Sequence, residues 1–526
     1  MYFARSQFRS VLFAALAVLG TGGCVGGVGD ATDDDTSDNP DDRARFNAWE
    51  GIRAERQAAL DAYLDQNRPA FEAFLHRAVG SNGVPLALLR NFSKVFPDIW
   101  GTPEESFGPQ GFFADPFQPY APVPFGLAVT RTSTGLDVAQ LTCAGCHTGR
   151  VIGPDGKVIT LIGAPNTLAN QFGTAIEKTV VDPRYLAAFG ENALTVGFRD
   201  KVLQKIQLSD LTAGAFTYNR QRVPNGPDLR DQASPGFLDA LSAGTPILTL
   251  PDLFDPAKAA LIVVAVLPPA PAQSDIMSVW RQDARTIAQW DGGIVSRLHR
   301  NLSAEIGVVS DPAAADFENA RLTTELTAGL PSAPYPFDVD LGLANSGKKL
   351  FEKYCEGCHH DNNATIFAAA KTGTDPNRAQ ATQAEARRRL IALLRTACPD
   401  PAVCNLPDDE IVLDLDAAGR GYVSHPLDGI WARAPYLHNG SVPTLHHLLV
   451  PESRPATFFR GSLRYDQAKV GFVWDDSAAA DPYTHVYDSG LAGRANTGHD
   501  TAEFNGIDWS QNPRDLAALL EYLKTL

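Results

Sequence analysis

The sequence predicts a mainly α protein of two domains, with long loop-rich insertions and little β structure. Three observations carry this expectation. The chain has 526 residues, and one domain holds about 100–200 residues. Apolar residues recur at helical spacing in several segments, most clearly near residues 343–354 and 513–526. The short motif C-x-x-C-H occurs twice, once in each half of the chain.

The N-terminus has the pattern of an export signal. Two arginines precede an apolar run at residues 11–19, which is too short to span a bilayer stably. The run leads to TGGC, which resembles a bacterial lipobox ending at Cys24. We expect a lipoprotein-type signal peptide over residues 1–23 and a lipid anchor at Cys24, on the periplasmic side of a Gram-negative cell envelope. An ordinary signal peptide with an incidental cysteine is the alternative, because Thr21 stands where a lipobox usually has Leu.

Residues 24–44 are expected to form a flexible acidic tether. Seven Asp lie between Asp30 and Asp42, in a stretch that has little to bury. The whole chain carries a net charge of −16. Such a chain has no electrostatic reason to bind nucleic acid.

An N-terminal domain with insertions is expected over residues 45–335. Helical segments are predicted at residues 54–79 and 86–96, ahead of the first motif, CAGCH at 143–147. Two short strands joined by a Gly-Lys turn are predicted after the motif, within residues 149–161.

A C-terminal domain is expected over residues 336–526. An amphipathic helix, LANSGKKLFEKY at residues 343–354, runs directly into the second motif, CEGCH at 355–359. The chain closes with a second helical pattern, PRDLAALLEYLKTL at residues 513–526, whose leucines form one stripe. We therefore expect one helix to enter the motif and another to cross it.

C-x-x-C-H is the attachment signal of c-type haem. Two thiols on one helical turn add to the haem vinyl groups, and the following His binds the iron as proximal ligand. A zinc site would use four thiols together and need no His after each pair, and a redox C-x-x-C would sit in a βαβ unit that the flanks do not show. We therefore expect two covalent haem c groups. Their attachment residues and proximal ligands are Cys143, Cys146 and His147 for the first, and Cys355, Cys358 and His359 for the second.

Longer segments resemble a known family. GKKLFEKYCEGCH and the closing ALLEYLKTL are similar to a cytochrome c domain, and APYLHNG at residues 434–440 is similar to a segment of the bacterial di-haem cytochrome c peroxidase superfamily. APYLHNGSVPTLHHLLVPESRPATFF and NTGHD are closest in appearance to its rubber-oxygenase branch, whose members are exported di-haem dioxygenases acting on polyisoprene or unsaturated fatty acids. The resemblance spans most of residues 85–526. It implies two cytochrome c-like haem domains and a haem oxidoreductase, either a peroxidase or a dioxygenase.

The resemblance also implies a distal ligand for the second haem. In the family this ligand comes from the loop before the last helix and is commonly Met, but here that loop holds His499. The resemblance therefore implies a haem with His359 and His499 as axial ligands, and an ordinary surface-loop residue is the alternative reading of His499. A bis-His haem has a lower potential than a His/Met haem, which suits it to electron relay.

The first haem has no local sixth ligand. No His or Met follows His147 within the next hundred residues, although His299 or Met277 could fold back. An open axial position is what O2 or peroxide activation requires. The candidate residues of its distal wall are Trp280, Arg281, Arg285, Trp290 and Glu305, and His438 is the candidate beside or between the haems. The alternative for the two tryptophans is a place in the core.

These expectations describe an exported di-haem oxidoreductase. The haem at His147 would activate peroxide or O2, and the haem at His359 and His499 would exchange electrons with a redox partner or an apolar organic substrate. A pure electron-transfer cytochrome is the alternative, and calcium binding is not readable from the sequence. Cys398 and Cys404 are expected to form a local disulfide in an oxidising compartment, with two free thiols as the alternative.

Overall fold

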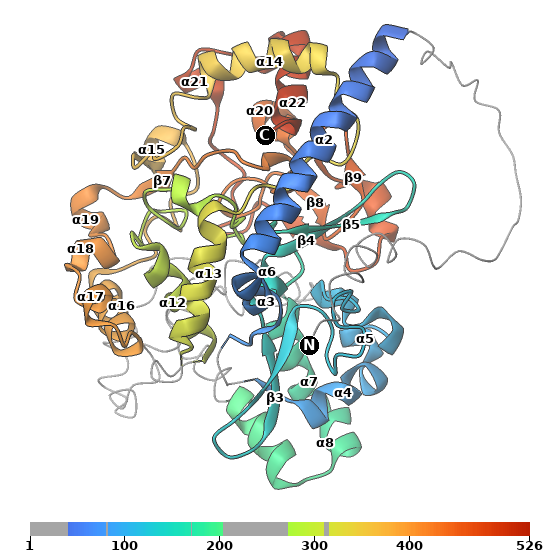
Figure 1. The fold of residues 1–526 in the computed structure, drawn as a ribbon, viewed down its shortest axis with the longest axis vertical. Coiled ribbons are helices and arrows are strands. Elements are labelled where there is room, and N and C mark those ends of the chain that lie inside the picture. Colours follow the sequence, from blue (N-terminus) through green and yellow to red (C-terminus); the bar gives the residue numbers. More distant parts are fainter. Residues whose placement is uncertain (1–39, 80–82, 170, 204–271, 310–314) are drawn as a thin grey trace, which may run out of the picture.

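The computed structural model describes residues 40–79, 83–169, 171–203, 272–309 and 315–526 (Figure 1). Helices prevail over strands in these ranges, and the strands form only small open sheets of two or three strands. The prediction of a mainly α fold with little β structure is confirmed. The predicted signal peptide and residues 24–39 of the predicted tether, Cys24 included, lie outside the described residues. The last five residues of that tether, 40–44, belong to a helix, α2 (Pro40–Gln66), and are not a flexible segment. Among the described helices, none is both long and apolar enough to cross a bilayer.

Two helices cross beside the second motif, at the upper end of Figure 1: α14 (Leu341–Tyr354) and α22 (Pro513–Lys524). The side chain of Asp340 accepts hydrogen bonds from two backbone N–H groups of the first turn of α14. At the crossing, a Cβ on Gly347 would lie 1.9 Å from the carbonyl oxygen of Ala518, so the backbones approach to a distance that only glycine permits. Both helices predicted from periodicity are confirmed.

The N-terminal helix α2 (Pro40–Gln66) lies along the C-terminal part of the chain (Figure 1). The indole N–H of buried Trp49 donates to the carbonyl of Phe337 at 2.8 Å. One hydrophobic core therefore takes residues from both of the domains expected from the sequence. The helix predicted over 54–79 is two helices, because Pro69 starts the separate α3 (Arg68–His76).

The lower end of the molecule has its own core (Figure 1). It is built on aromatic side chains such as Phe92 and Trp100, whose rings lie 5.1 Å apart. The prediction of a helix over 86–96 is confirmed by α4. The helices of this part are α4 (Leu86–Val95), α5 (Pro97–Trp100), α7 (Gln171–Val181) and α8 (Arg184–Phe189).

Strands flank the first motif on both sides. Before it, β1, β2 and β3 form an antiparallel sheet in the order β1-β3-β2; after it, β4 pairs with β5. The strand pair after the motif was predicted, whereas the sheet before it was not. The bounds are β1 (Val84–Pro85), β2 (Leu127–Arg131), β3 (Asp137–Leu141), β4 (Thr148–Ile152) and β5 (Val158–Ile162).

A third core joins α12 (Arg297–Val309) and α13 (Phe317–Gly329) to α16 (Ala384–Ala397). The predicted disulfide between Cys398 and Cys404 closes a short loop at the end of α16 and is confirmed. The remaining helices are α15 (Ala369–Thr372), α17 (Pro401–Cys404), α18 (Asp408–Ile411), α19 (Leu415–Ala418), α20 (Leu445–Leu449) and α21 (Thr501–Phe504). The remaining strands pair as β6 (Ile366–Ala368) with β7 (Gly421–Val423), β8 (Thr457–Arg460) with β11 (His485–Asp488), and β9 (Tyr465–Asp466) with β10 (Gly471–Phe472).

Candidate haem centres

The first C-x-x-C-H motif forms one helical turn, α6 (Cys143–Cys146), between β3 and β4. The turn is capped by Thr142, whose hydroxyl accepts from the N–H of Gly145 at 3.3 Å. Burial raises the pKa of Cys143 to about 12 and that of Cys146 to about 11. A redox C-x-x-C motif lowers the pKa of its reactive thiol, whereas the pKa of both thiols is raised here.

The imidazole of His147 is oriented by the backbone. Its Nδ1–H donates to the carbonyl oxygen of Met277 at 3.0 Å, which leaves Nε2 as the nitrogen available to a metal. Burial lowers the pKa of His147 to about 4, and the charges of Arg300 and Arg285 add to this effect. The imidazole is therefore neutral, as a metal ligand must be. The backbone carbonyl of Met277 lies on the Nδ1 side of the ring, away from the nitrogen that would bind iron.

The second motif is held in the same way. The Nδ1–H of His359 donates to the carbonyl oxygen of His425 at 2.9 Å. The backbone turn closes with the N–H of His359 donating to the carbonyl of Cys355, also at 2.9 Å. Burial raises the pKa of Cys355 to about 12 and lowers that of His359. The thiol of Cys355 is thus neutral, as are those of Cys143 and Cys146, and each motif presents a neutral imidazole whose Nε2 is left for a ligand bond.

The structure brings the imidazole rings of His359 and His499 close together. Their ring centroids lie 6.3 Å apart with an interplanar angle of 41°. Metal–imidazole bonds of about 2.0–2.1 Å on opposite sides of one ion put two ring centroids roughly 6 Å apart, so the spacing fits an iron between them. Burial lowers the pKa of His499 to about 3, which keeps this ring neutral as well.

All 11 His belong to the part of the chain that the structure describes, and within it no ring contact joins His147 to another histidine as one joins His359 to His499. His299, which the sequence left as a possible ligand folding back to the first haem, is fully buried on α12. Burial lowers the pKa of His299, and the charge of Arg395 on α16 lowers it further. Within the same ranges no group of three or more His, Cys, Asp or Glu could hold a metal ion by itself. A haem needs at most two such ligands, because the porphyrin supplies the other four.

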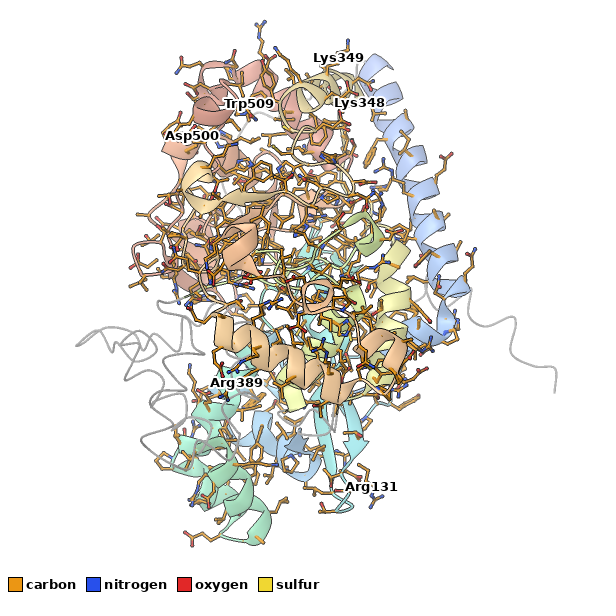
Figure 2. All side chains as sticks on the ribbon, turned by 90° about the vertical axis from the view of Figure 1, so that its left-hand side faces the viewer. Arg131, Lys348, Lys349, Arg389, Asp500 and Trp509 are labelled. Carbon is orange, nitrogen blue, oxygen red and sulfur yellow. A yellow bond between two sulfur atoms is a disulfide. The ribbon has the colours of Figure 1, made fainter. Side chains whose placement is uncertain are left out.

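The loop that carries His499 is clamped from two sides. The N–H of His499 donates to the carbonyl of Thr372 at 2.9 Å, and a Cβ on Gly498 would lie 2.4 Å from Thr374 Oγ1. Arg454 donates from Nη1 to the carbonyl of Gly498 at 2.8 Å. Figure 2 shows the neighbouring Asp500 at the upper end of the molecule. Gly498 and Arg454 were not predicted from the sequence, because a short polar loop gives no periodic signal.

His438 lies against Tyr422 rather than against either proximal histidine. The two rings stack with centroids 4.3 Å apart, and the Tyr422 hydroxyl is 3.2 Å from Nε2 of His438. The next residue, Asn439, donates to the carbonyls of Gly493 and Ala495, just before the loop of His499. The segment of His438 therefore supports that loop, and a role of the imidazole itself stays a prediction.

Trp280 and Arg281 lie between the two motifs. Trp280 is fully buried, and its indole packs on Gly163, whose N–H donates to the carbonyl of His147. The guanidinium of Arg281 forms ion pairs with Asp361 and Asp428 near the second motif. Trp280 belongs to the hydrophobic core that takes residues from both expected domains, which is the alternative given for it from the sequence.

Trp290 lies elsewhere, with its N–H donating to the carbonyl of Asp275 at 2.9 Å and its ring packed in a small cluster that includes Tyr422. Glu305, on α12, is 2 % exposed and accepts from the side-chain amide of Asn319 on α13 at 2.7 Å. Burial raises the pKa of Glu305 to about 8, and once ionised at higher pH the carboxylate raises the pKa of Cys143. Glu305 is therefore a buried, protonated carboxyl beside the first motif.

Two family models match parts of the chain. A model described as RoxA-like, cytochrome c-like matches residues 421–459, and a Y4iN-like domain model matches residues 69–147. The first match contains His425, Arg433 and His438, and the second ends at His147. Residues 421–459 are thus similar to part of a cytochrome c-like domain.

Three relatives come from Sinorhizobium fredii (strain NBRC 101917 / NGR234), and all are uncharacterised. The protein y4iM is 41 % identical over 284 residues, covering 49 % of this chain and 66 % of y4iM. The protein y4iJ is 27 % identical over 483 residues, covering 75 % of this chain and 78 % of y4iJ. The protein y4iN is 33 % identical over 127 residues, covering 21 % of this chain and 61 % of y4iN. The chain thus spans slightly less than two thirds of y4iM and of y4iN, and its activity is a matter for proposal.

Proposed function

We propose that this chain is a di-haem c-type oxidoreductase, in which the haem at His147 binds peroxide or O2 and the haem at His359 and His499 relays electrons. The single observation that carries the proposal is the inequality of the two proximal histidines. His359 faces a second imidazole at 6.3 Å, while His147 faces none among the described residues. One haem would be saturated with ligands, and the other would keep one axial side for a substrate.

The residues around both motifs support the binding of haem. Each proximal imidazole is neutral and donates from Nδ1 to a backbone carbonyl, of Met277 in one case and His425 in the other. Such a bond fixes the tautomer, aims Nε2 and raises its basicity. When bound, the haems would supply iron that exchanges electrons and, at an open position, takes up O2 or peroxide.

Glu305 is suited to proton transfer at the first motif. Its carboxyl keeps a proton up to a pH of about 8, because burial raises its pKa. A carboxylic acid with a pKa near the working pH can donate a proton to an oxygen that is being reduced. The neighbouring Asn319 holds Oε1, so the orientation of the carboxyl is fixed.

The similarity of residues 421–459 to a RoxA-like cytochrome supports the dioxygenase version of the proposal, with an apolar organic substrate. In the peroxidase version, the substrate is peroxide and electrons come from a redox partner. Export, a lipid anchor at Cys24 and a periplasmic location belong to the same proposal and rest on the sequence of residues 1–24.

Activity assays on the purified full-length holoprotein test the proposal. O2 consumption with polyisoprene or an unsaturated fatty acid, without an external reductant, would identify a dioxygenase. Peroxide-dependent oxidation of a reduced cytochrome would identify a peroxidase. Two low-spin haems by EPR that bind neither cyanide nor peroxide would overturn the enzyme and leave an electron-transfer cytochrome. His147→Ala should abolish activity, whereas His360→Ala, at an exposed histidine next to a proximal ligand, should preserve it.

A further inference from the structure

Two arginines are bonded to the segments that orient the proximal histidines, and a third, Arg300, is close enough to His147 for its charge to lower the pKa of that ring. Arg285 is 7 % exposed and donates from Nη1 to the carbonyl of Ser278 at 3.0 Å and from Nη2 to its hydroxyl at 3.3 Å. Ser278 directly follows Met277, whose carbonyl orients His147. Arg285 is therefore fixed to the segment behind the first proximal ligand.

Arg433 is fixed in the same way to the second site. Its Nη1 donates to the carbonyl of Pro426 at 3.0 Å, and its Nη2 to the carbonyl of Asp428. Pro426 directly follows His425, whose carbonyl orients His359. Arg433 thus belongs to the second site as Arg285 belongs to the first.

Electrostatic interactions link the three arginines to the two sites. Besides burial, the charges of Arg300 and Arg285 lower the pKa of His147. Besides burial, the charges of Arg285 and Arg433 lower the pKa of His425. Arg285 therefore acts on both sites, Arg300 acts on the first, and Arg433 acts on the second.

The positive charge of this set is not matched by the protein groups that the structure describes. Arg285 is buried, while Arg300 and Arg433 are half-buried, and the loss of solvent lowers the pKa of Arg285 to about 10 and that of the other two to about 9. Asp428, the carboxylate that acts on Arg285 and Arg433, already pairs with Arg281 at 2.7 Å. Buried charges persist where they are paired, so this place favours an anion.

We propose that Arg285, Arg300 and Arg433 bind the propionate carboxylates of the two haems, Arg300 at the first haem, Arg433 at the second and Arg285 between them. This inference rests on the proposed function, because it requires two haems. Each haem carries two propionates, and the planar guanidinium group forms paired hydrogen bonds with a carboxylate. Arg285 then adjusts the reduction potentials of both haems together.

A nearby positive charge favours the reduced, less positive iron, so its removal lowers the potential. At an effective dielectric constant of ~20, a unit charge ~12 Å away changes a one-electron equilibrium constant by about tenfold. For one electron this corresponds to about 59 mV. Arg285→Gln should therefore lower both potentials by about this amount, Arg300→Gln mainly the first and Arg433→Gln mainly the second.

The experiment is an optically monitored potentiometric titration of the full-length holoprotein and these variants. The matched control is Arg131→Gln, at an exposed arginine at the opposite end of the molecule from Asp500 (Figure 2), and it should leave both potentials unchanged. Arg285→Lys keeps the charge and should keep both potentials close to wild type. If Arg285→Gln shifts one potential alone, or neither, at full haem content, the inference is wrong.

Haem content separates this inference from the proposed function. The pyridine haemochrome assay should give two haems per wild-type chain, and fewer would contradict the proposed function itself. Two haems combined with unshifted potentials in the arginine variants would overturn only the arginine assignment. If Arg285→Gln fails to fold, Arg300→Gln and Arg433→Gln still decide, because equal shifts of both potentials in either variant contradict the assignment.

Discussion

Replacing Glu305 with Gln should make the protein more stable at high pH. In the folded chain, burial raises the pKa of this carboxyl from 4.5 to about 8. Between these values the folded state binds a proton that the unfolded state has lost, so stability falls as pH rises through this window. Since one pKa unit is worth about 1.36 kcal/mol, the full difference is roughly 4–5 kcal/mol. Gln cannot ionise and still accepts the hydrogen bond from Asn319, so the stability of the variant does not fall as pH rises through this window.

Urea denaturation at pH 5, 6, 7, 8 and 9 measures the effect. Wild type and Glu305→Gln should have similar stability near pH 5 and diverge by roughly 4–5 kcal/mol at pH 9. Glu325→Gln, at a carboxyl on neighbouring α13 that is 53 % exposed, is the control and should follow the wild type throughout. Parallel stability curves for wild type and Glu305→Gln would refute the assignment of a buried, protonated carboxyl.

Two glycine substitutions test the helix crossing and the loop before the last helix. Gly347→Ala forces a Cβ to within 1.9 Å of the carbonyl of Ala518 and should lower the free energy of unfolding by about 1–3 kcal/mol. The control is Gly51→Ala, in α2 with open space around it, which should raise the free energy of unfolding by up to about 1 kcal/mol. Equal urea midpoints for the two variants would contradict the close crossing of α14 and α22. Gly498→Ala puts a Cβ 2.4 Å from a threonine oxygen and should displace the adjacent histidine, seen by EPR as high-spin signal from the second haem. The control is Gly506→Ala, with a similar φ of +69° and no neighbour within 4 Å, which adds backbone strain without a steric clash. The second haem should remain low-spin in this variant.

Local patterns in the sequence were sufficient for the elements next to the haem motifs. The periodic apolar positions of α14 and α22 predicted two helices, and the short apolar runs after the first motif predicted β4 and β5. The spacing of Cys398 and Cys404 predicted their disulfide. The resemblance suggested His499 as a partner of His359, and the structure places the two rings at a distance that fits. All of these features depend on contacts between near neighbours or on a motif.

Features that depend on distant parts of the chain could not be predicted. The sheet before the first motif pairs β1 with β3 across more than fifty residues of chain, and no alternation in two-residue β1 signals it. The carbonyls of Met277 and His425 orient the proximal imidazoles, but backbone carbonyls carry no sequence signal. Arg285 was a candidate for the distal wall, but nothing local indicated its hydrogen bonds to Ser278, beside the residue whose carbonyl orients His147.

The most direct test of the two unequal haem sites is a carbon monoxide titration of the reduced holoprotein. CO binds ferrous haem that has an open or weakly held axial position, so the account predicts one CO per chain, taken up at the haem of His147. His499→Ala should raise the stoichiometry to two, because it removes the imidazole that faces His359 at 6.3 Å. No CO bound to the wild type, or two CO per wild-type chain, would contradict the division of the two sites into a ligand-binding haem and a ligand-saturated haem.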